Sequence, residues 1–104
     1  MIQAIKKMLG LGPKVDYKVL AQNGAQIIDV RTKAEYDSGH IPGAVNIPLQ
    51  NLGSSLSKIK KDRPVITCCA SGMRSASAKT ILKSKGYAEV YNGGSWMSLH
   101  NKIS

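Results

Sequence analysis

The run Val65-Ile-Thr-Cys-Cys-Ala-Ser-Gly-Met-Arg-Ser75 joins an apolar stretch to a short polar loop that contains a glycine. Its first five residues, Val65–Cys69, predict a buried strand, because β-branched residues favour strands and no charge interrupts them. Helix-forming residues follow from Arg74 to Lys85, and Gly86 predicts the end of that helix. The apolar side chains expected to face inward are those of Ala76, Ile81 and Leu82. A strand, a tight loop and a helix in this order form the unit from which parallel sheets are built.

The same alternation continues on both sides of this unit. Further strands are predicted at Gln26–Val30, Ala44–Ile47 and Glu89–Tyr91. Helices are predicted from an Asp16 cap through Gln22, from a Thr32–Glu35 capping box to Gly39, weakly over Leu49–Lys58, and from a Ser95 cap to about Asn101. Gly93-Gly94 predicts a turn. Short strands alternating with short helices predict an α/β fold, with a parallel sheet covered on both faces.

Length and composition limit the fold to one domain. The chain has 104 residues, of which 42% are hydrophobic and 20% charged. These values are typical of a globular domain and exclude a large multidomain enzyme. Phe is absent and only four Tyr and one Trp are present, so the core is expected to be aliphatic.

The charge is strongly positive. Fifteen Lys and Arg residues against six Asp and Glu residues give a formal net charge of +9. Such a field favours small anions, acidic proteins, anionic membranes or nucleic acids, and it also serves simply as a solubilising surface. No aromatic residues interleave with the basic ones as a base-stacking surface requires, so nucleic-acid binding is not expected.

The N-terminal segment differs from the rest of the chain. Residues 1–12 are expected to be an amphipathic extension, with Ile2, Ile5, Met8 and Leu9 near one helical face, and residues 13–104 to form the domain. The apolar runs are too short for a transmembrane helix, so no stable membrane insertion is expected. Lys6 and Lys7 interrupt the stretch, which therefore lacks the apolar centre of a signal peptide. A cytoplasmic location is favoured, although an exported protein without its signal peptide would have the same sequence.

Only two cysteines are present, and they are neighbours in the predicted strand. A disulfide between Cys68 and Cys69 would be badly strained, and two cysteines alone do not match the spacing of a zinc site. No metal is therefore expected. Neighbours in a strand point to opposite faces. We expect Cys68 to be a buried hydrophobic residue and Cys69 to be a reactive thiol.

Cys69 lies where a thiolate is favoured. Free N–H groups at the start of the following helix stabilise an anion and lower a thiol pKa. Gly72 allows the loop N–H groups to turn inward, Arg74 adds a positive charge, and Ser71 and Ser75 add hydroxyl donors. Phosphatases with such a cradle place five residues between Cys and Arg. Here only four separate them, a smaller ring that favours a sulfur atom over a phosphoryl group.

The chain resembles the single-domain rhodaneses (rhodanese-like sulfurtransferases) in three blocks between Asp16 and Leu99. The first contains Asp29-Val-Arg31 and Gly39-His-Ile-Pro-Gly-Ala44, and the second is Cys69-Ala-Ser-Gly-Met-Arg-Ser75. The third comprises Gly86-Tyr87, Val90-Tyr91, Gly93-Gly94 and Trp96. The resemblance implies a three-layer sandwich with a five-stranded parallel sheet and helices on both faces.

The resemblance also implies the chemistry. Cys69 is the expected nucleophile, taking a sulfur atom from thiosulfate or a similar small anionic donor and passing it as a persulfide to cyanide or a thiol. No cofactor is implied. The residues expected to cradle the substrate are Ala70, Ser71, Gly72, Met73, Arg74 and Ser75.

Three other residues of the family signature are expected to support the loop or the fold and not to take part in the chemistry. Asp29 and Arg31 are expected to brace the loop, with a weak surface ion pair as the alternative, and His40 is expected to be structural. Many loops in the family carry a basic residue where this chain has Ala70, which leaves the donor open. Two further functions therefore stay open: a persulfide carrier served by an acidic protein partner, and a non-catalytic binding module.

Overall fold

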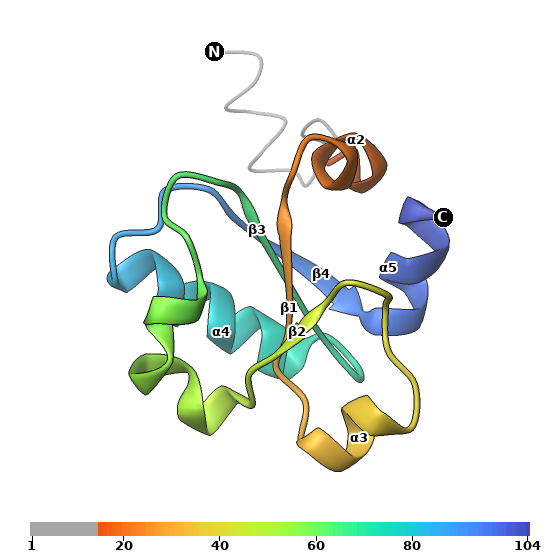
Figure 1. Cartoon of the computed structure of the whole chain (residues 1–104), viewed down its shortest axis with the longest axis horizontal. Helices are drawn as coiled ribbons and strands as arrows, with labels where there is room; N and C mark the ends of the chain where they lie inside the picture. The colour runs from red at the N-terminus through yellow and green to blue at the C-terminus, as the bar shows by residue number, and fades with distance from the viewer. Residues whose placement is uncertain (1–14) are drawn as a thin grey trace, which may run out of the picture.

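The computed structural model describes residues 15–104, and within them four parallel strands form one sheet (Figure 1). The strands are β1 (Gln26–Asp29), β2 (Val45–Asn46), β3 (Val65–Cys69) and β4 (Val90–Ser95), in the order β2-β1-β3-β4. The α/β fold with a parallel sheet is confirmed. The described residues contain four strands rather than the five that the resemblance implied, the same number as the residue patterns predicted.

Helices cover both faces of the sheet. The elements are α2 (Tyr17–Gln22), α3 (Lys33–Asp37), α4 (Met73–Ser84), α5 (Trp96–Ile103) and two 3₁₀ segments, η1 (Leu49–Ser54) and η2 (Leu56–Lys58). One face packs against α4 and the 3₁₀ segments through Leu52, Ala78 and Leu82. The other packs against α2 and α5 through Leu20, Trp96 and Leu99. These two apolar clusters give the three-layer arrangement.

The three predicted helix caps, Asp16, Thr32 and Ser95, are confirmed. The Asp16 carboxylate accepts from the N–H of Val19 at 3.1 Å, and the Ser95 hydroxyl accepts from the N–H of Ser98 at 3.2 Å. Thr32 and Glu35 form both halves of the capping box. Each cap is local, because the side chain binds a backbone group three residues away.

Of the three residues of α4 predicted to face inward, Leu82 is buried and Ile81 packs against the core, but the prediction for Ala76 is wrong. Ala76 is exposed, and the buried residues of the helix are Ser75, Ala78 and Leu82. These three are spaced by three and four residues, which places them on one side of the helix. The helix begins at Met73, and burial of Ser75 brings its hydroxyl group to the end of β3.

The segment expected to be a weak helix over Leu49–Lys58 forms η1 and η2 instead. Pro48 precedes η1 and supplies no side-chain cap. Short 3₁₀ turns tolerate such a start, because they close with i to i+3 bonds.

Gly93 and Gly94 lie inside β4 and do not form the predicted turn. A Cβ atom on Gly93 would lie 2.8 Å from Leu99 Cδ2 and 2.9 Å from both Ile66 Cγ2 and Thr67 O. Glycine is required there because α5 and β3 approach the strand too closely for a side chain.

The predicted amphipathic extension, residues 1–12, lies outside the described residues. Within residues 15–104, no helix combines the length and apolar character needed to cross a bilayer.

Candidate active site

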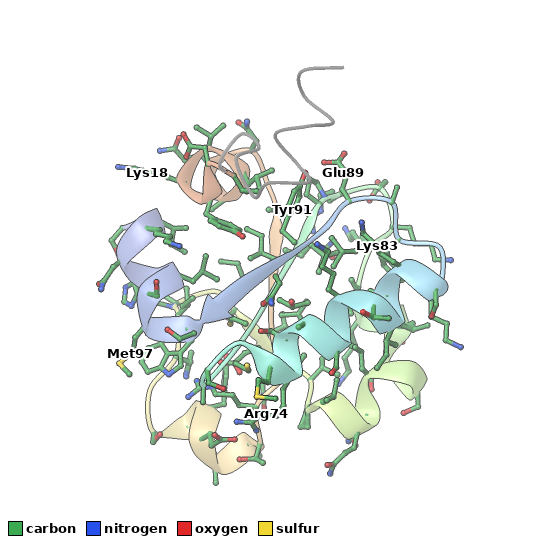
Figure 2. The ribbon with its side chains drawn as sticks, turned by 180° about the vertical axis from the view of Figure 1, so that it is seen from behind. Lys18, Arg74, Lys83, Glu89, Tyr91 and Met97 are labelled. Carbon is green, nitrogen blue, oxygen red and sulfur yellow. The ribbon has the colours of Figure 1, made fainter. Side chains whose placement is uncertain are left out.

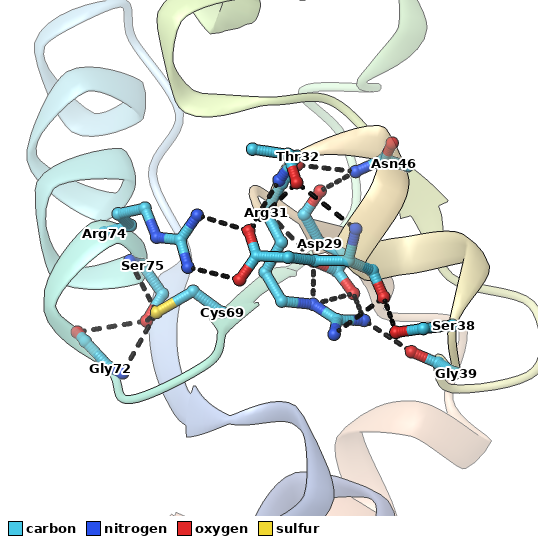
Figure 3. A network of polar contacts seen from close by, with 11 residues as sticks. Asp29, Arg31, Thr32, Ser38, Gly39, Asn46, Cys69, Gly72, Arg74 and Ser75 are labelled. Atoms are coloured by element: carbon cyan, nitrogen blue, oxygen red, sulfur yellow. Dashed lines mark hydrogen bonds and ion pairs between the residues drawn. The ribbon is translucent and has the colours of Figure 1, made fainter.

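The Cys69 loop lies beyond the carboxyl end of β3, between the strand and α4 (Figure 3). This is where the α/β arrangement places ligand sites, because strand ends and helix starts meet there. Cys69 itself is fully buried, while Ala70, Ser71 and Met73 of the loop are exposed. The loop therefore covers the thiol with its backbone and turns three side chains outward.

Backbone and hydroxyl groups surround the Cys69 sulfur. The N–H of Gly72 donates to Sγ at 2.9 Å, and the N–H of Ser75 donates at 3.4 Å. The Ser75 hydroxyl lies 3.4 Å from Sγ, as acceptor from a thiol and as potential donor to a thiolate. N–H groups that converge on one atom favour its anionic form.

The two neighbouring thiols differ in acidity. Burial acts to raise the pKa of Cys69, but hydrogen bonds from the Ser75 hydroxyl and from the N–H groups of Ser75, Gly72 and Ser71 lower it further than burial raises it. Burial raises the pKa of Cys68 to about 12, and the nearby Asp29 carboxylate adds to this effect. Both cysteines are free thiols, and they belong to the clusters on opposite faces of the sheet. Because side chains alternate along a strand, the Cys69 sulfur faces the hydrogen-bond donors of the loop, whereas the Cys68 sulfur is buried in the apolar cluster on the other face.

Gly72 makes the loop possible. It caps α4 with φ at 103°, in the left-handed region that favours glycine. A side chain there would also lie 3.4 Å from the Cα atom of Gly94 on β4. The conformation directs the Gly72 N–H at Sγ while its carbonyl accepts from the N–H of Ala76 at 3.1 Å.

Arg74 is bound to a partner that the sequence analysis did not assign to the site. Its Nη1 and Nη2 atoms donate to Oε1 and Oε2 of Glu35 at 2.7 and 2.9 Å. The Arg74 guanidinium, followed by bonds from Thr32, lowers the pKa of Glu35 to about 2. From the sequence, Glu35 was predicted to cap a helix and was given no role beside the Cys69 loop. It also ties α3 to the start of α4, so much of the Arg74 charge is balanced beside the loop.

Asp29 and Arg31 form a buried ion pair, so the alternative of a surface pair is wrong. Arg31 donates to both carboxylate oxygens of Asp29, with Nη2 at 2.7 Å from Oδ2, and the two side chains are 4% and 0% exposed. Arg31 also donates to the carbonyls of Glu35 and Gly39 and lies over the Trp96 ring. The pair therefore holds α3, and within residues 15–104 its hydrogen bonds lead to the Cys69 loop through Glu35 and Arg74.

His40 lies in this supporting structure and not at the thiol. Its Nδ1 is 2.7 Å from the Tyr36 carbonyl, and its ring stacks on that of Tyr36 at 3.7 Å. The side chain fastens the end of α3, in agreement with the structural role expected for it.

Asn92 is a second residue of the site that sequence analysis missed. It lies on β4, and its amide group contacts Gly72 and Ser75 of the loop. In the sequence, the one feature that marks Asn92 is its position directly before Gly93-Gly94, and that glycine pair was predicted to form a turn.

Comparisons with known proteins agree with this geometry. The family model for the rhodanese-like domain matches residues 14–100. The chain is 44% identical over 68 residues to the uncharacterized protein YqhL of Bacillus subtilis, covering 65% of this chain and 54% of that protein. It is 34% identical over 80 residues to the thiosulfate sulfurtransferase GlpE of Pseudomonas fluorescens, covering 77% and 73%. A solved structure, a rhodanese with anions from E. coli, superimposes with a TM-score of 0.68 at 34% identity, covering 72% of this chain and 91% of that one.

Proposed function

The chain belongs to the rhodanese-like domain family, and from that premise we propose that it is a sulfurtransferase that carries a sulfane sulfur atom as a Cys69 persulfide. The observation that carries the proposal is the set of N–H groups around Cys69 Sγ, with Gly72 N at 2.9 Å. These donors hold a thiolate without a general base, and a thiolate is the form that attacks sulfane sulfur.

In the first half of the proposed reaction, the Cys69 thiolate attacks the outer sulfur of thiosulfate. A bond forms between Sγ and that sulfur, the S–S bond of thiosulfate breaks, and sulfite leaves with the electron pair. The outer sulfur of the persulfide is then the anionic atom. The N–H groups of Ala70 to Ser75 are the donors proposed to stabilise it.

In the second half, cyanide or a thiolate attacks the outer sulfur. The bond to Sγ breaks, and Cys69 returns as a thiolate that the Gly72 and Ser75 N–H groups again stabilise. The two halves share one site, so ping-pong kinetics are expected. A thiosulfate donor is supported by the name of the Pseudomonas fluorescens relative, and its use by this chain belongs to the proposal.

The position of the basic residues bears on the alternative of an acidic protein donor. Lys83 lies near the end of α4 and Arg74 at its start, at opposite ends of the helix in Figure 2. Basic residues also precede β3, at the end of the strand away from Cys69; they are Lys58, Lys60, Lys61 and Arg63. An acidic partner docked on this end would lie far from the thiol, so the geometry favours a small donor.

The test is intact mass after incubation with thiosulfate, for wild type, Cys69→Ser and Cys68→Ser. We expect a gain of about 32 Da, one sulfur atom, in wild type and Cys68→Ser and none in Cys69→Ser. A gain only from a persulfidated protein would indicate the carrier instead. No gain from thiosulfate, polysulfide or a protein persulfide would leave a binding module.

A further inference from the structure

Asn92 joins the edge strand β4 to the Cys69 loop through all of its amide atoms. Nδ2 donates to the carbonyl of Gly72 at 3.2 Å. Oδ1 accepts from the N–H of Gly94 at 3.0 Å and from the Ser75 hydroxyl at 2.6 Å. A neighbour in the core, Tyr17, donates its hydroxyl to the Asn92 carbonyl at 2.9 Å and fixes the backbone beneath the side chain.

The orientation of this amide follows from its backbone partners. The Gly94 N–H can only donate and the Gly72 carbonyl can only accept, so Oδ1 and Nδ2 cannot exchange places. The Ser75 hydroxyl, 2.6 Å from Oδ1, must then supply the proton of that contact. While Cys69 is a thiol, Ser75 consequently gives its one proton to Asn92 and accepts the Cys69 proton through a lone pair.

The backbone N–H groups donate to the Cys69 sulfur whichever way the Ser75 hydroxyl points. The Gly72 N–H is the nearest donor to Sγ at 2.9 Å, and the Ser75 N–H comes from the same helix start. Both belong to residues that Asn92 holds from the opposite side. We propose that Asn92 is a positioning residue for Cys69, which keeps Gly72 and Ser75 in register beneath the sulfur by anchoring them to β4. The inference rests on the proposed function only for its relevance to sulfur transfer, since its effect is on the thiol itself.

The other ionisable groups near Cys69 do not contact the Asn92 amide among the described residues. Arg74 is paired with Glu35, Asp29 is paired with Arg31 at the end of β1, and the Cys68 side chain belongs to the apolar cluster on the other face of the sheet. Burial and the neighbouring Tyr91 raise the pKa of Tyr17, so that phenol stays protonated through the working range. If the pKa of Cys69 shifts when Asn92 is substituted, the shift therefore reports the loss of the hydrogen bonds from Asn92 to Gly72 and Ser75.

The test measures the rate of Cys69 alkylation by iodoacetamide against pH, with the site of modification located by mass spectrometry. The midpoint of the curve reports the acidity of the thiol, and the plateau reports access to it. We expect Asn92→Ala to raise the midpoint by about 0.5–1 pH unit, which lowers the thiolate fraction about three- to tenfold at pH values well below the wild-type midpoint. Activity with thiosulfate should fall by the same factor at those pH values and recover above the new midpoint.

Asn46→Ala is the matched control. Asn46 is also a half-buried asparagine on an edge strand, and its amide donates to the carbonyls of Asp29 and Arg31 at 3.0 and 2.9 Å. Replacing Asn46 by alanine removes two comparable hydrogen bonds at the opposite edge of the sheet from β4. We expect Asn46→Ala to lower stability while its alkylation midpoint stays at the wild-type value.

Asn92→Asp is a second variant, for the case in which Asn92→Ala does not fold. It keeps the acceptor for Gly94 and Ser75, removes the donor to Gly72 and adds a negative charge, so a midpoint above that of wild type is expected. The proposal is overturned if folded Asn92→Ala keeps or lowers the wild-type midpoint, or if Asn46→Ala raises it equally. Because alkylation needs no sulfur donor, a shifted midpoint in a protein that gains no sulfur would refute the proposed function alone.

Discussion

Individual residues decide the chemistry of this site through backbone geometry more than through side-chain charge. The Gly72 conformation directs an N–H at Cys69, and the guanidinium of Arg74 is engaged by Glu35. Cys68, one residue earlier, has a pKa raised to about 12 in the same strand. The different pKa values of the two neighbouring thiols are therefore set by the hydrogen-bond donors and the burial that each sulfur meets.

The lowered pKa of Cys69 predicts the pH dependence of sulfur transfer. The thiolate fraction falls as pH drops through this pKa, so kcat/KM for the donor should fall on the acid side of a midpoint below that of an ordinary cysteine. The measurement is kcat/KM for thiosulfate between pH 5 and pH 10, at constant ionic strength. An acid limb with its midpoint at or above the ordinary cysteine value would contradict the donor set assigned here.

Gly93 offers a prediction about stability at a single residue. Gly93→Ala should lower the free energy of unfolding by about 2 kcal/mol or more, because the new Cβ would meet Leu99, Ile66 and the Thr67 carbonyl within 2.9 Å. Urea unfolding measures the loss. Gly53→Ala is the control, since a Cβ there meets nothing within 4 Å, and its effect should stay within about 1 kcal/mol. Equal stability of the two variants would show that β4 shifts to accept a side chain.

At the scale of elements, the ion pair between Glu35 and Arg74 ties α3 to α4. The folded pKa of Glu35 is lowered from 4.5 to about 2, mainly by the Arg74 guanidinium. A lowered carboxyl pKa contributes stability that is complete above about pH 4.5 and is lost as pH falls through about 2. The pair is partly exposed, so salt should weaken it.

Glu35→Gln should therefore be less stable than wild type at pH 7, and the difference should shrink as pH falls from 4.5 toward 2. Urea unfolding at a series of pH values measures this convergence. Asp37→Asn removes the exposed pair with Lys33 on the same helix and is expected to change stability little. A constant difference between wild type and Glu35→Gln over the whole series would exclude the ion pair as its cause.

At the scale of the whole molecule, the net charge of +9 opposes folding through repulsion. The described residues hold three ion pairs, too few to balance the excess of basic groups. Raising NaCl from low to physiological concentration should accordingly raise Tm by several degrees, because the repulsion is screened. A Lys60→Gln, Lys61→Gln variant should show a smaller rise in the same thermal scans. A Tm that falls with salt would mean that the ion pairs outweigh the repulsion.

Much of the fold, and the thiol with the lowered pKa, could be predicted from sequence, because the patterns concerned are local. The caps at Asp16 and Thr32 act over three residues, and the apolar run Val65–Cys69 marks a strand wherever it lies. Cys69 was identifiable because a thiol between a strand and a helix start meets N–H groups that its own loop supplies.

The tertiary structure alone decided which distant side chains complete the site. Glu35 reaches Arg74 across 39 positions, and Asn92 reaches Gly72 across 20, because the sheet order sets α3 and β4 on either side of the Cys69 loop. Gly93 was likewise predicted to lie in a turn, whereas it lies inside β4 with Leu99 and Ile66 close against it. Sequence patterns report the conformation of neighbours along the chain, whereas these contacts depend on the packing of elements that only the folded sheet brings together.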